Sequence, residues 1–308
     1  MTMVRQELDP EVAEGVALIE LGDLGDLGPE VLAAMRGSFS LPTPEGIEFT
    51  DRQVPGDPDV TVRVYRAEGA ATPAPCIYSM HGGGYVIGSR EIDDGVFARW
   101  CPELGVVGVS VEYRLAPETS YPGPLEDCYR GLAWTYEHAD ELGIDRTRIG
   151  VAGTSAGGGL AAALAILTRD RGEIPLAFQL LDCPMIDDRQ QTPSSRLEDL
   201  PVWSRRSNEF GWRSYLGDLY GRDDIPPTAA PARATDLAGL PPAFVSVGTV
   251  DGFRDEDIAY AMQLNQAGVP TELHVYPGAC HGYQIAFTSA VAQQSRTDVE
   301  RWLRRQIT

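Results

Sequence analysis

Residues 150–159 of the sequence, GVAGTSAGGG, place five glycines around a single serine, Ser155. Glycine loses more backbone freedom on folding than any other residue, so this density weakens the segment unless a backbone constraint requires it. A strand-like apolar run leads into the segment and a helix-like run leaves it. G-x-S-x-G in that context predicts a sharp, strained turn from strand to helix, at which larger residues than Gly153 and Gly157 would collide.

The pattern along the chain predicts an α/β domain around this turn. Predicted strands, β-branched and apolar between turn-forming residues, fall at 60–67, 76–82, 106–113, 148–154, 176–184, 243–249 and 272–277. Predicted helices fall at 91–101, 124–138, 156–170, 254–267 and 287–305. This alternation indicates a mostly parallel sheet with helices on both faces. The polar–apolar alternation within 60–67 favours an antiparallel edge strand.

Two segments interrupt the alternation of strands and helices. Residues 1–45 have helix-like patterns with no strand until about residue 47, and residues 187–230 form a long insert rich in arginine, aspartate and aromatic residues. An insert of this length usually has helices or a functional role of its own. We expect 1–308 to form a single domain in which both segments build a helical cap over one end of the sheet.

The charge of the chain excludes several classes of partner. All 25 basic residues are arginine, and 45 acidic residues give a formal net charge of −20. Nucleic acid and anionic membranes are therefore disfavoured partners. Salt adaptation and coding bias both account for such a composition. The apolar runs are too short to span a membrane, and the acidic first residues do not resemble a secretory signal, so we expect a cytoplasmic protein.

The cysteines predict neither a metal site nor a disulfide framework. There are five, at positions 76, 101, 128, 183 and 280, with no C-x-x-C spacing. We expect buried free thiols and no metal. Cys280 precedes His281 directly, but neighbours on one loop seldom face each other, so a cysteine nucleophile is disfavoured.

A serine nucleophile needs a base and an acid that orients the base. In this class of fold they follow the serine in the order acid, then histidine. Two histidines follow Ser155. His274 lies inside a predicted strand and is expected to be structural, whereas His281 lies in a loop at the carboxyl end of the sheet, where we also expect Ser155 to be exposed. His281 is therefore the predicted base.

The predicted orienting acid is Asp251, the first carboxylate beyond the strand at 243–249. Asp255 is the second candidate. It opens the next predicted helix together with Glu256 and Asp257, where acids commonly favour the helix dipole.

A glycine-rich loop also follows the predicted strand at 76–82. In MHGGGYVIGS (80–89), three consecutive glycines allow backbone N–H groups to approach a substrate oxygen, and the amide of Ala156 would complete an oxyanion hole. The spacing does not fit a dinucleotide-binding G-x-G-x-x-G loop.

Taken together, these motifs resemble those of the bacterial hormone-sensitive-lipase-like esterases, also called family IV. The matching segments are HGGG (81–84), YRLAPE (113–118), YPGPLED (121–127), GTSAGG (153–158), FRDE (253–256) and PGACHGY (277–283). The resemblance implies an α/β-hydrolase fold with a helical cap, frequent homodimers, and no metal or cofactor.

Carried over by position, the resemblance implies specific roles. Ser155 is the nucleophile, His281 the base and Asp251 the acid. Gly83, Gly84 and Ala156 supply the oxyanion donors, and His81 shapes the loop. Thr154 stands where many members have aspartate, which is similar to a separate GTSAG branch, and the residues after Asp251 lack the usual proline and leucine. Both departures bear on substrate preference.

The expected function is hydrolysis of short- to medium-chain carboxylic esters through an acyl-enzyme. An amidase, thioesterase, lactonase or carbamate hydrolase would use the same residues, because fold and triad do not choose among them. A non-catalytic binding protein, as in the related plant gibberellin receptors, is disfavoured because all three triad residues are present. A long-chain lipase is disfavoured because no apolar lid is evident.

Overall fold

The computed structural model describes residues 6–17, 19, 22–36 and 46–308. The strands are β1 (Ile47–Val54), β2 (Val60–Ala67), β3 (Ala74–Met80), β4 (Val107–Glu112), β5 (Ile144–Thr154), β6 (Gln179–Asp182), β7 (Ala243–Val250) and β8 (Thr271–Cys280). They form one sheet in the order β1-β2-β4-β3-β5-β6-β7-β8. β2 pairs antiparallel with β1 and β4, and every other neighbouring pair is parallel.

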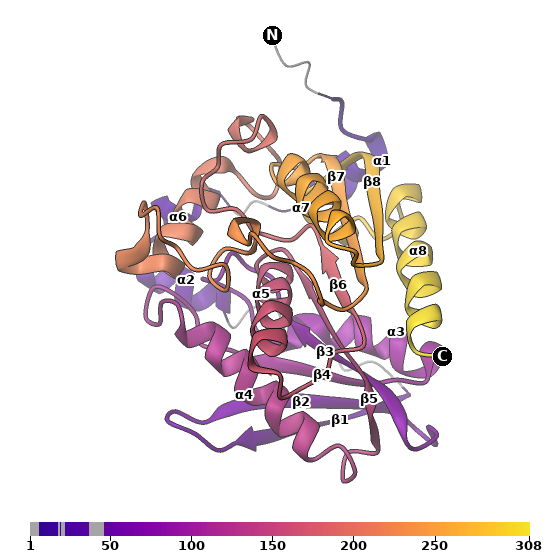
Figure 1. Ribbon diagram of the computed structural model, residues 1–308. Helices are drawn as coiled ribbons and strands as arrows, with labels where there is room; N and C mark the ends of the chain where they lie inside the picture. Colours follow the sequence, from indigo (N-terminus) through magenta and orange to yellow (C-terminus); the bar gives the residue numbers. More distant parts are fainter. Residues whose placement is uncertain (1–5, 18, 20–21, 37–45) are drawn as a thin grey trace.

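Helices cover both faces of this sheet (Figure 1). They are α1 (Pro10–Val16), α2 (Pro29–Arg36), α3 (Asp94–Leu104), α4 (Gly123–Glu137), α5 (Ala156–Arg171), α6 (Arg205–Leu216), α7 (Arg254–Gln266) and α8 (Ala290–Gln306). Residues of α3 and α8 share one apolar core with the sheet, and residues of α4, α5 and α7 share another. No helix in the described part of the chain is long and apolar enough to cross a membrane.

The predicted edge position of residues 60–67 is wrong. The strand is antiparallel, but β1 pairs with it along eight residues and takes the edge itself. The sequence of β1, IEFTDRQV, carries charged residues that remain exposed on the outer strand. Such charges are common on edge strands, where they discourage pairing with other chains.

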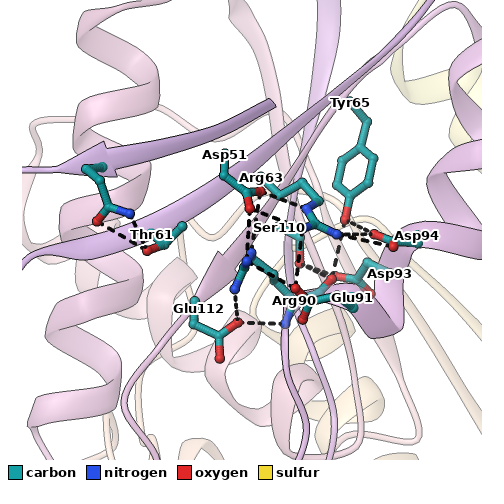
Figure 2. A network of polar contacts seen from close by, with 11 residues as sticks. Asp51, Thr61, Arg63, Tyr65, Arg90, Glu91, Asp93, Asp94, Ser110 and Glu112 are labelled. Atoms are coloured by element: carbon teal, nitrogen blue, oxygen red, sulfur yellow. Dashed lines mark hydrogen bonds and ion pairs between the residues drawn. The ribbon is translucent and has the colours of Figure 1, made fainter. Parts of the chain in front are cut away.

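A charged network secures β1 and β2 to the start of α3 (Figure 2). The Arg63 guanidinium bonds Asp51 at 2.7 Å and Asp94 at 3.2 Å. Arg90, in the short 3₁₀ helix η2 (Arg90–Asp93), bonds both Asp51 and Glu112. The network therefore fixes the chain that follows the glycine-rich loop after β3.

Two segments distant in sequence meet at the end of the molecule where α6 lies (Figure 1). Leu24, in the 3₁₀ helix η1 (Leu24–Asp26), is fully buried, and its amide donates to Ser207 Oγ of α6 at 3.0 Å. These segments belong to the predicted cap, of which residues 1–5, 18, 20–21 and 37–45 lie outside the described residues.

Candidate active site

The turn between β5 and α5 has a backbone that only its glycines permit. Ser155 has φ 59° and ψ −123°, a conformation rare for a residue with a side chain. A Cβ on Gly153 would lie 2.2 Å from the carbonyl oxygen of Gly157, and a Cβ on Gly157 would lie 1.9 Å from that of Met80. Position 153 must therefore be glycine because the turn folds back on itself there, and position 157 must be glycine because it lies against β3.

Ser155 is 6% exposed, so the expectation of an exposed serine is wrong. Its hydroxyl bonds His281, and the glycine-rich loop packs against its other side, where a Cβ on Gly82 would lie 3.4 Å from Ser155 Cβ. The loops at the end of the sheet enclose the side chain that the turn presents.

His281 lies between Ser155 and Asp251. Its Nε2 is 2.8 Å from Ser155 Oγ, and its Nδ1 is 2.9 Å from Asp251 Oδ2. The other oxygen of Asp251 accepts the amide of Phe253 at 2.9 Å, which fixes the carboxylate. Phe253 contacts the imidazole edge-on, and Trp203 of the insert lies 6.2 Å from it between ring centroids. The arrangement can carry a proton from the serine to the imidazole.

The glycine-rich loop presents free amides at the same place. Gly83 and Gly84 have φ of 120° and 60°, in the left-handed region. Among the described residues, no protein group accepts a hydrogen bond from the amides of Gly83, Gly84 or Ala156. His81 lies behind the loop, stacked on Tyr113 with ring centroids 4.3 Å apart, and burial lowers its pKa. Backbone donors without a protein acceptor are what an oxyanion hole needs.

The other candidates from the sequence take no part in the hydrogen bonds that join Ser155, His281 and Asp251. His274 stacks on Phe244 and bonds Glu272 on the sheet. Asp255 accepts the amide of Ser194 at 2.7 Å and the guanidinium of Arg254. Glu256 and Asp257 are buried in α7.

One group in the described part of the chain has metal-ligand spacing. One ligand atom each from Cys183, Asp251 and His281 lie within 4.8 Å of one another. His281 and Asp251 already share a hydrogen bond, and burial raises the pKa of the Cys183 thiol well above its usual range. A thiolate ligand is therefore disfavoured, and the group fits proton transfer better than metal binding.

Sequence reasoning missed one buried carboxylate beside the site, Asp182. It ends β6, is 9% exposed, and bonds Ser246 and Gln284 through its carboxylate. Burial raises its pKa to about 6. An ionisable residue near the end of the mostly apolar run LAFQLLDCP was the available signal.

Residues 77–285 match a family described as alpha/beta hydrolase fold. The carboxylesterase NlhH of Mycobacterium tuberculosis is 36% identical over 290 residues, which cover 92% of this chain and 90% of that one. The esterase LipI of the same organism is 40% identical over 68% of this chain and 66% of its own. A solved bacterial heroin esterase is 41% identical, with a TM-score of 0.91 and 98% of both chains covered.

Proposed function

The chain belongs to the alpha/beta hydrolase fold family, in its hormone-sensitive-lipase-like group, and we infer that it is a serine carboxylesterase acting through Ser155, His281 and Asp251. The observation that supports this assignment most strongly is the pair of hydrogen bonds, 2.8 Å and 2.9 Å long, that joins the three side chains. Its substrates are small-molecule carboxylic esters.

The reaction proceeds in two halves. Ser155 Oγ attacks the ester carbonyl carbon while His281 Nε2 takes the hydroxyl proton. His281 then gives that proton to the leaving alcohol, and an acyl-enzyme remains on the serine. Water, deprotonated by His281, attacks the acyl carbon. His281 then returns the proton to Ser155 Oγ as the carboxylic acid leaves, which restores the free enzyme. Asp251 keeps the imidazole in the tautomer with a proton on Nδ1 and stabilises the imidazolium.

The negative oxygen of each tetrahedral intermediate lies against the amides of Gly83, Gly84 and Ala156. These donors need no rearrangement, because they have no protein acceptor in the described part of the chain. Each such donor contributes about 3 kcal/mol to transition-state stabilisation.

We expect a preference for short to medium acyl chains, because Trp203 lies beside His281 and little space is left there. A cavity of about 10 Å³, room for about one water, lies there and is lined by Leu200, Trp203 and Phe253 among others. The Trp203 ring also touches Gly84, where a Cβ would lie 2.1 Å from its edge. Trp203 therefore limits the size of the group that can occupy this side of the site.

The two segments that meet beside α6 form the cap. Leu24 from within residues 1–45 packs with the insert at 187–230, which also supplies Trp203. A single domain with this cap would separate the serine from bulk water during the reaction.

A cytoplasmic location agrees with five buried free thiols. A homodimer stays a prediction from the family, and light scattering tests it.

Hydrolysis of p-nitrophenyl esters from acetate to palmitate tests the function. We expect the rate to peak at short or medium chains, Ser155→Ala to lose it by about 10⁴-fold or more, and Trp203→Ala to shift the peak to longer chains. Folded wild-type protein that hydrolyses none of the esters would contradict the assignment, and p-nitroanilides and thioesters would then be assayed.

A further inference from the structure

We propose that Asp182 is a positioning residue that ties the turn carrying Ser155 to the loop carrying His281. This inference rests on the proposed function, since it concerns the geometry of the same relay. Asp182 touches neither the substrate nor the reacting atoms in the mechanism above, and it acts through the two residues that do.

We call this connection between the Ser155 turn and the His281 loop the tie, and the backbone of Asp182 makes its first half. Asp182 is paired with Thr154 across the parallel strands β5 and β6, and its carbonyl oxygen accepts the amide of Ser155 at 2.9 Å. The same strand pairs on its other side with β7, where Asp182 lies opposite Ser246. The position of Asp182 is therefore fixed by the centre of the sheet.

The second half is made by the side chain. Asp182 Oδ2 accepts Gln284 Nε2 at 2.5 Å, and Oδ1 accepts Ser246 Oγ at 2.6 Å. Gln284 follows His281 by three residues in the loop that leaves β8. Both carboxylate oxygens are thus occupied, one by the sheet and one by the histidine loop.

This short connection bridges a long path through the fold. Ser155 and His281 are 126 residues apart, and β6 and β7 separate their strands β5 and β8 in the sheet. One residue, Asp182, spans that gap with a hydrogen bond to each side. The length of the serine–histidine hydrogen bond therefore depends on Gln284 being held.

The negative charge of Asp182 acts on the site independently of the hydrogen bonds that its carboxylate accepts. The experiment must distinguish the effect of the charge from the effect of these hydrogen bonds. Among the charged neighbours of Asp182, His281 lowers the pKa of its carboxyl and Asp251 raises it. Asp257 of α7 and Cys183 also interact electrostatically with Asp182. Replacing the carboxylate by an amide removes its charge but keeps its shape. The Gln284 amide can then turn, so that its oxygen accepts the new N–H.

The decisive variant is Gln284→Met, which keeps the length of the side chain and removes its donor. Its matched control is Ser246→Ala, which removes the other hydrogen bond to the same carboxylate.

At about pH 8 we expect Gln284→Met to lower kcat about 10-fold, which corresponds to about 1.4 kcal/mol of transition-state stabilisation, with KM within about 2-fold of wild type. Ser246→Ala and Asp182→Asn should keep kcat within about 3-fold. Gln284→Asn, too short to reach Asp182, should repeat the loss.

Amide hydrogen exchange supplies a readout that needs no activity. The tie predicts faster exchange in residues 282–286 of Gln284→Met than of wild type, and no change there in Asp182→Asn. Equal kcat in Gln284→Met and wild type with unchanged exchange would overturn the proposal. A loss of kcat in Asp182→Asn with wild-type kcat in Gln284→Met would assign the effect to the charge and overturn it too. Wild-type protein inert on every ester would instead refute the proposed function, and the exchange result would still decide the tie.

Discussion

At the scale of single residues, the site depends on side chains whose surroundings leave them one arrangement. Asp251 is 1% exposed, and each of its carboxylate oxygens accepts a hydrogen bond, one from His281 and one from the amide of Phe253. A carboxylate fixed in this way can orient an imidazole without moving during the reaction.

Asp251→Asn should lower kcat by about 10³–10⁴-fold, because an amide at this position favours the wrong tautomer of His281. Asp255→Asn is the matched control. Its carboxylate bonds Ser194 and Arg254, so we expect its kcat to change by less than about 3-fold. Steady-state kinetics of both variants on p-nitrophenyl acetate checks this, and a larger loss in Asp255→Asn than in Asp251→Asn would contradict the proposed acid.

The sequence identifies those site residues whose role is visible from the residues next to them in the chain. The glycines around Ser155 and the loop position of His281 are visible in the sequence, and the structure brings both residues together with Asp251. The contact between Asp182 and Gln284 could not be found in this way, because it joins β6 to the loop after β8. The burial of Ser155 likewise depends on loops from elsewhere in the chain.

At the scale of elements, the turn from β5 into α5 is limited by its contact with β3. Gly157→Ala should destabilise the protein by about 3 kcal/mol and abolish activity, because its Cβ would lie 1.9 Å from the Met80 carbonyl oxygen. Gly95→Ala in α3 meets no atom within 4 Å and should be neutral or stabilising by up to about 1 kcal/mol. Urea unfolding measures both, and equal stability of the two variants would contradict the packing described.

The network around β1 and β2 predicts a dependence of stability on pH. The Arg63 guanidinium beside Asp51 lowers the pKa of that carboxyl to about 2 from 3.8. A lowered pKa in the folded state stabilises the protein above the unfolded value, and this contribution is lost as the pH falls from about 4 to about 2. The difference in free energy of unfolding between wild type and Asp51→Asn should shrink over that range. A difference that stays constant from pH 6 to pH 2 would contradict it.

Most elements of the fold could be predicted because each carries its own pattern. The apolar runs at 148–154 and 243–249 lie within β5 and β7. The edge of the sheet could not be assigned from the sequence. The alternation of polar and apolar residues in 60–67 is found in any antiparallel strand that has one solvent-exposed face. Only the pairing with β1 shows that this strand is internal.

At the scale of the whole molecule, the insert and the amino-terminal segment share one apolar core with the sheet. Leu24→Ala should lower the free energy of unfolding by about 2–4 kcal/mol, because Leu24 is fully buried in that core. Arg206→Ala is the control on the same interface. Its exposed pairs with Asp23 and Asp26 should contribute less than about 1 kcal/mol. Denaturant unfolding that finds Leu24→Ala as stable as Arg206→Ala would contradict this packing.

The central claim is that Ser155 carries the acyl group. Intact-mass spectrometry after brief mixing with p-nitrophenyl acetate at low pH, followed by peptide mapping, tests it most directly. We predict a single acetyl adduct on the peptide that contains Ser155, and no adduct in Ser155→Ala. An acetyl group on another residue, or an equal adduct in Ser155→Ala, would contradict the account.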